Sequence, residues 1–74
     1  MPHKFHVLGV PVFTRSLPSG DMVVWHPYNS AVREVIEPIC RERGYWRPGY
    51  NNWIIHACHC ESVLGKLALM EDAS

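Results

Sequence analysis

The sequence predicts one small α+β domain over residues 1–74, with the element order ββαββα. Three observations indicate this class. Strand-forming residues gather in four short segments, and two further segments repeat apolar residues with the period of a helix. The third is length, because a chain of 74 residues can fill only one modest core. A four-stranded, mostly antiparallel sheet with two helices packed on one face would bury both apolar stripes.

The N-terminal segment predicts a β-hairpin. Residues 5–13 are rich in β-branched and aromatic side chains, and Pro11 within them indicates an edge position or a bulge. Residues 16–21 contain a cluster of turn formers. Residues 22–26 predict a second strand, paired antiparallel with the first.

An amphipathic helix is expected next, with Asn29 or Ser30 as its N-cap. Five apolar residues fall on one helical face at the spacing i, i+3, i+4, i+7, i+8: Val32, Val35, Ile36, Ile39 and Cys40. Pro38 predicts a kink or a detached last turn, since it lacks the backbone N–H that a helix needs. Gly44 fits the C′ position that closes a helix.

The C-terminal half predicts two more strands and a closing helix. Strands are expected at residues 45–46 and 53–57, joined by a loop of turn formers at residues 47–52. From Cys60 the pattern becomes helical, with an apolar stripe of Val63, Leu64, Leu67 and Ala68. Residues 71–74 are expected to form a disordered tail.

Charge and composition narrow the function classes. Seven basic and seven acidic residues give a net charge of zero, whereas nucleic-acid-binding domains are usually basic. No apolar run approaches the ~20 residues that cross a bilayer, and the N-terminus does not resemble a signal peptide. A cytoplasmic protein without membrane contact is therefore expected, and three cysteines, an odd number, agree with a reducing compartment.

The histidine and cysteine cluster His56, Cys58 and Cys60 has the ligand types of a zinc site. On one straight strand these three residues would share a face and could not easily close a tetrahedron, so no metal and no cofactor are expected. A zinc site would need a bend here or a ligand from the N-terminal strand. Cys60 near a helix N-terminus is also a candidate nucleophile, because such thiols can have a lowered pKa. It lacks a set of orienting and oxyanion-binding partners, so no catalytic residues and no enzyme activity are expected.

The region around residues 45–53 carries the best candidate binding surface. It combines arginines with aromatic and amide side chains: Arg41, Arg43, Trp46, Arg47, Tyr50, Asn51 and Asn52. Aromatic faces stack on bases, arginine pairs with phosphate and asparagine reads base edges. The same mixture is typical of protein–protein hot spots. The alternative is that Tyr45 and Trp53 belong to the core and the loop only connects two strands.

The order of features over residues 23–69 resembles a known family. A strand ending near Tyr28 is followed by an amphipathic helix, then by Tyr45, a polar turn, Trp53 on a strand and a last helix. This order resembles the small HARP-type domain found beside annealing helicases, and a related short domain in proteins of conjugative elements. The resemblance implies a ββα-type unit that handles branched or single-stranded DNA. Trp46 and the pair Asn51-Asn52 replace the charged residues that this family tends to carry there.

Two functions follow as hypotheses. The first is a non-enzymatic module that binds single-stranded or branched DNA through the aromatic and arginine loop. The alternative is a protein-binding module, such as a phage or mobile-element inhibitor of a host defence system, acting as a monomer or a homodimer.

Overall fold

The computed structural model describes residues 3–71 and arranges them as βββαββα. The strands are β1 (His3–Val7), β2 (Val10–Ser16), β3 (Met22–Trp25), β4 (Gly44–Arg47) and β5 (Asn52–Ile55). The helices are α1 (Ser30–Arg41) and α2 (Cys60–Met70), with short 3-10 turns η1 (Pro48–Tyr50) and η2 (Ala57–His59). The predicted α+β class, with an antiparallel sheet and two helices, is confirmed. Of the expected tail, residues 72–74 lie outside the described part.

The sheet has five strands where the sequence predicted four, because residues 5–13 form a hairpin and not one strand. Leu8 and Gly9 have φ of 52° and 78°, the positive values that a two-residue type I′ turn needs at both central positions. Pro11 lies beyond the register of β2 with β3, which begins at Phe13. Its missing N–H therefore interrupts no strand pairing there.

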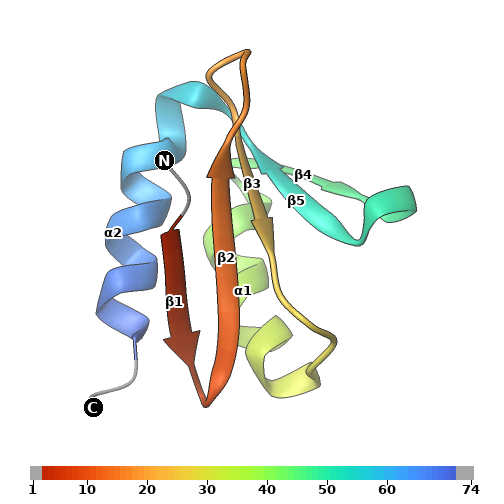
Figure 1. Ribbon diagram of the computed structural model, residues 1–74, viewed down its shortest axis with the longest axis vertical. Coiled ribbons are helices and arrows are strands. Elements are labelled where there is room, and N and C mark those ends of the chain that lie inside the picture. The colour runs from red at the N-terminus through yellow and green to blue at the C-terminus, as the bar shows by residue number, and fades with distance from the viewer. Residues whose placement is uncertain (1–2, 72–74) are drawn as a thin grey trace.

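All strand pairs are antiparallel, in the order β1-β2-β3-β5-β4 (Figure 1). The chain leaves β3 through α1, which lies behind the sheet in Figure 1, and returns into β4. It then reverses, so that β5 and not β4 pairs with β3. The β4–β5 hairpin diverges from the other strands toward its η1 tip.

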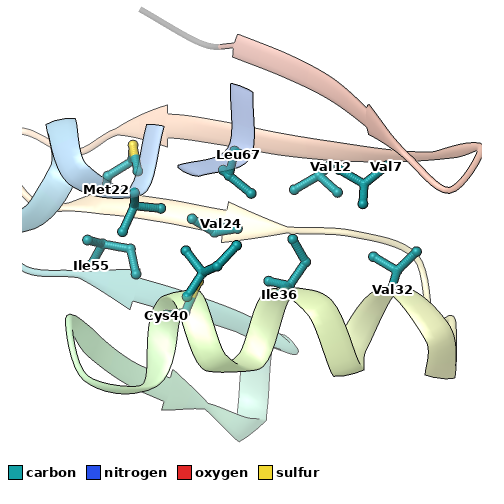
Figure 2. Packing of buried hydrophobic residues seen from close by; sticks show 11 residues of the cluster. Val7, Val12, Met22, Val24, Val32, Ile36, Cys40, Ile55 and Leu67 are labelled. Carbon is teal, nitrogen blue, oxygen red and sulfur yellow. The ribbon is translucent and has the colours of Figure 1, made fainter. Parts of the chain in front are cut away.

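Both helices pack on the same sheet face. Alternate strand residues point to opposite faces, and those on the helix side join one core with residues of both helices (Figure 2). The members are Val7, Val12, Met22, Val24, Val32, Ile36, Ile39, Cys40, Ile55, Val63 and Leu67. Eighteen residues, 42–59, separate the end of α1 from the start of α2, and they include β4 and β5. The core therefore joins residues from both halves of the chain.

Helix α1 begins at its predicted cap, where the Val32 N–H donates to Asn29 Oδ1 at 3.0 Å. The prediction of a kink or a detached turn at Pro38 gains no support from the helix boundaries, since α1 runs without a break to Arg41. Pro38 is exposed, so water can solvate the carbonyl whose N–H partner proline removes. Glu42 caps the helix, and Gly44 is not the C′ residue but the first residue of β4.

Helix α2 begins at Cys60 as predicted and buries Val63 and Leu67, while Leu64 is half-buried. Ala68, the fourth member of the predicted stripe, is exposed. Among residues 3–71, neither helix has the length and apolarity needed to span a bilayer.

Candidate functional site

The β4–β5 hairpin presents two different sides. Its register places Trp46 opposite Trp53, on the side that faces α1, and Tyr45 opposite Ile54, on the outer side. The two indoles meet edge to face, with ring centroids 5.4 Å apart and planes at 66°. Trp53 is partly buried against the core, whereas 43% of Trp46 remains exposed. The hairpin therefore offers an aromatic surface on its helix side.

This aromatic surface is the floor of a pocket of about 610 Å³, called here the tryptophan pocket. Its wall comes from the end of β3, from α1 and from the hairpin tip. The lining residues are Val24, Trp25, His26, Pro27, Tyr28, Arg33, Glu37, Arg41, Trp46, Asn51 and Trp53. Tyr28 is 85% exposed, so its ring is available at the rim.

The α1 wall of the pocket carries a charged triplet. Arg33, Glu37 and Arg41 follow at intervals of four residues and lie along one side of the helix. Arg33 Nε lies 3.4 Å from one carboxylate oxygen of Glu37, and Arg41 Nη2 contacts the other. Two guanidinium groups share one carboxylate, which leaves an excess of one positive charge. Both arginine side chains are about two-thirds exposed, at 65% and 69%, so they can also reach a ligand.

The outer side of the hairpin holds a second cluster. Arg47 Nε donates to Asn52 Oδ1 at 3.2 Å, and its guanidinium carbon lies 4.1 Å from the centroid of the Tyr50 ring. Tyr45 is 50% exposed, and its ring centroid lies 5.9 Å from that of His56. The alternative that Tyr45 belongs to the core is therefore wrong, whereas Trp53 does pack against the core.

The structure thus divides the predicted binding residues into two groups. Arg41, Trp46 and Asn51 line the tryptophan pocket. Arg47, Tyr50 and Asn52 belong to the outer cluster. Arg43 joins neither group, because its Nη1 donates to the Ile39 carbonyl at 3.0 Å and so serves the end of α1.

Outside the hairpin, sequence reasoning found Arg41 but missed the other residues of the pocket. The arginines and the glutamate of α1 carry a signal, since their four-residue spacing places them on one helix face. Trp25 and Tyr28 have no such signal in the sequence, because only the pairing of β3 with β5 brings the end of β3 beside the hairpin.

No protein-family model, no curated protein and no solved structure matches this chain. The resemblance to HARP-type domains therefore stays a prediction from the order of features.

The histidine and cysteine cluster does not lie on one strand face. His56 follows β5, Cys58 lies in η2 and Cys60 is the first residue of α2. Among residues 3–71, no three His, Cys, Asp or Glu side chains are grouped so that they could hold a metal ion. The Cys60 thiol donates to the His56 carbonyl at 3.5 Å. Burial raises the pKa of Cys60, and the nearby Asp21 and Cys58 raise it further, which is opposite to what a nucleophilic thiol needs.

Proposed function

We propose that this chain is a non-enzymatic binding module for single-stranded or branched DNA, and that the β4–β5 hairpin is its contact element. The observation that supports the proposal most is the tryptophan pocket, where two contacting indoles lie beside two exposed arginines. Aromatic rings and cations in one groove are the two components with which proteins hold unpaired strands.

Each component has a distinct role. The exposed indole of Trp46 offers a face or edge to an unstacked base, and the pocket volume lies within the range typical of small-ligand sites. Arg33 and Arg41 supply guanidinium groups for the adjoining phosphates. Glu37 holds both arginines toward the pocket before the ligand arrives, which reduces the entropy lost on binding. The Asn51 amide lies at the pocket wall, where it can donate to and accept from a base edge.

The proposal implies a preference among DNA forms. Bases within a duplex are stacked on each other and present no open face to Trp46. Single strands, and the unpaired arms of forks, present such faces without the free-energy cost of unstacking a duplex.

The test is a titration of fluorescently labelled single-stranded, forked and duplex DNA, at about 50 and 200 mM salt, followed by anisotropy. The wild-type protein is expected to bind the single strand and the fork below about 10 μM and more tightly than the duplex. Trp46→Ala is expected to weaken binding by 1–3 kcal/mol, roughly 5- to 150-fold, the usual loss for one stacked base. Arg41→Ala is expected to lower the slope of log affinity against log salt by about 0.7, the value for one phosphate contact on a single strand.

Lys66→Ala is the matched control, since Lys66 is an exposed cation on α2 and does not line the tryptophan pocket. It is expected to change neither affinity nor slope by a comparable amount. Equal losses in Lys66→Ala and Arg41→Ala would show that binding follows overall charge and would contradict the hairpin site.

A protein partner is the second candidate, and one observation favours it. β4 is an edge strand, because it pairs with β5 on one side and with no other strand of the described chain. An exposed edge can accept a strand from a partner, and the aromatic residues beside it are typical of hot spots. A phage or mobile-element inhibitor would show a stoichiometric partner in a pull-down from bacterial lysate, lost on Trp46→Ala.

A further inference from the structure

The zero net charge of the chain conceals an uneven distribution of charges. None of the five strands contains an aspartate or a glutamate. The acidic residues of the described chain all lie in helices or connecting segments: Asp21, Glu34, Glu37, Glu42, Glu61 and Glu71. Three cations do lie in strands, namely Lys4, Arg15 and Arg47. The sheet is therefore basic, although the whole chain is neutral.

All three strand cations belong to the outer sheet face, opposite the helices. The register aligns Lys4 with Phe13, and Phe13 with Trp25, in a row across β1, β2 and β3. These residues alternate with Val12 and Val24, which belong to the core on the helix side.

A second row crosses four strands beside the first. It aligns Arg15 with Val23, Val23 with Ile54, and Ile54 with Tyr45. Arg47 follows Tyr45 by two positions along β4 and so lies on the same face. Each row thus combines aromatic rings with a cation at its β1 or β2 end.

Three aromatic side chains on this face are partly exposed to solvent. Phe13 is 39%, Trp25 38% and Tyr45 50% exposed. The ring centroids of Phe13 and Trp25 lie 5.5 Å apart, with the two planes tilted by 33°. Val23 and Ile54 lie between the aromatic positions and are almost fully buried, although neither belongs to the core cluster under the helices. The outer face thus has buried aliphatic residues at its centre and partly exposed aromatic rings around them.

We propose that the outer sheet face continues the DNA path that begins in the tryptophan pocket. This inference rests on the proposed function of the hairpin. Trp25 connects the two surfaces, because it lines the tryptophan pocket and also a shallow depression of about 300 Å³ with Phe13 and Arg15. A strand that leaves the pocket passes Trp25, stacks bases on Phe13, and places phosphates against Arg15 and Lys4.

Charge complementarity selects a nucleic acid as the occupant. A second copy of the chain, bound symmetrically through this face, would set Lys4, Arg15 and Arg47 against the same cations with no carboxylate from any strand. A polyphosphate backbone supplies the missing negative charge, and its bases supply flat partners for the rings.

The experiment measures anisotropy with labelled oligothymidylates of about 4 and about 12 nucleotides, lengths within the range that single-strand-binding domains cover. The part of the outer sheet face around Phe13, Arg15 and Trp25 is called the platform. The platform variant is the double substitution Phe13→Ala with Arg15→Ala, and the pocket variant is Trp46→Ala. Phe13→Tyr keeps an aromatic ring and serves as the conservative control, and Lys66→Ala controls for net charge. Circular dichroism and thermal unfolding verify that each variant is folded.

The platform variant is expected to lose about tenfold in affinity for the longer oligonucleotide and about 0.7 of the salt slope. It should keep wild-type affinity for the shorter one, which the pocket holds alone. Phe13→Tyr and Lys66→Ala should behave as the wild type with both. The pocket variant should weaken binding of both lengths.

The outcomes separate the two proposals. Wild-type affinity of the platform variant for the longer oligonucleotide, together with a loss in the pocket variant, would overturn the platform and leave the hairpin function standing. The reverse pattern would overturn the hairpin function, and with it the continuous path, because DNA would then bind the outer sheet face without the pocket. A wild-type protein that binds neither length would overturn both. Self-association in sedimentation that disappears in the platform variant would identify a second copy as the occupant, and would also overturn the platform.

Discussion

Gly44 is the glycine with the least space for a side chain. It follows the end of α1 closely and opens β4, where it pairs with Ile55 of β5. A Cβ placed on Gly44 would lie 1.9 Å from the Ile54 carbonyl oxygen and 2.9 Å from the Ile55 Cα. Backbone atoms cannot move aside as a flexible side chain can. Gly44→Ala is therefore expected to destabilise the protein by at least about 2 kcal/mol, measured by urea unfolding.

Gly65 provides the matched control for this substitution. It lies inside α2, and a Cβ there would meet no atom within 4 Å. Gly65→Ala is expected to stabilise the protein by about 0.5–1 kcal/mol, because alanine loses less backbone entropy in a helix. Similar unfolding free energies for the two alanine variants would contradict the close approach at Gly44.

Cys40 links the stability of the core to pH. Burial raises the pKa of its thiol from about 9 to about 12, against a smaller lowering by Arg43. Between these values the unfolded chain loses the thiol proton while the folded chain keeps it. The stability that the protein gains from keeping this thiol protonated is therefore complete below pH 9. The free energy of unfolding falls as pH rises from 9 toward 12, by up to about 1.4 kcal/mol per pH unit.

The measurement compares urea unfolding of the wild type and Cys40→Ala across this alkaline range. The alanine variant is expected to be less stable at pH 7, since it leaves a cavity, but to lose stability less steeply with pH. Parallel pH profiles for the two proteins would contradict the raised pKa.

The β1–β2 hairpin turns through a residue that fits its conformation poorly. Leu8 has φ of 52°, a left-handed value that β-carbon crowding disfavours and that asparagine tolerates better. With Gly9 already in the second position, Leu8→Asn creates the preferred Asn-Gly pair of a type I′ turn. It is expected to raise the free energy of unfolding by about 0.5–1 kcal/mol in urea titrations. Leu8→Val, which is β-branched, is expected to lower it instead.

This turn also shows why the sequence predicted four strands. The pair Leu8-Gly9 lacks the asparagine or aspartate that signals a type I′ turn, and it interrupts an otherwise continuous strand-forming segment. Elements with a periodic or capping signal were predicted well, including the Asn29 cap, the buried face of α1 and the start of α2 at Cys60. The boundary at Gly44 was not, because glycine after a helix fits a C′ residue as well as a close strand contact.

The candidate site was predictable within the hairpin and at Arg41, which ends α1. Trp46 and Asn51 come from the segment that the sequence singled out, and both line the tryptophan pocket. Arg33 and Glu37 join them through the packing of α1 against β4. Trp25 and Tyr28 join them through the pairing of β3 with β5, which are more than twenty residues apart in sequence. A local sequence pattern cannot predict that β3 and β5 lie side by side.

At the scale of the whole molecule, net charge proves a poor guide to the surface. The zero total lowered the expectation of DNA binding, yet the strands hold three cations and no acidic residue. The absence of acidic residues from the sheet becomes evident only in the folded chain, because acidic and basic residues alternate along much of the sequence.

Amide protection should follow the order of strands in the sheet. β3 lies at the centre with β2 and β5 on either side, whereas β1 and β4 are edges. Hydrogen exchange followed by NMR is expected to be slowest in β3, around Val23 and Val24, and faster by at least about tenfold in β4. Equal protection of β4 and β3 would indicate that something covers the β4 edge in solution, as a stable self-association would.

The pairing of β3 with β5 also bears on how the chain reaches its native state. Every other strand pair joins neighbours in sequence, so each can close through a short turn soon after folding begins. β3 and β5 must instead meet across α1 and β4, and this meeting creates the central part of the sheet. A formed α1 shortens the search, because twelve helical residues span only about 18 Å. We therefore expect the slow step of folding to be the docking of the β4–β5 hairpin onto the three-stranded unit β1-β2-β3, with α1 as the tether that decides its rate.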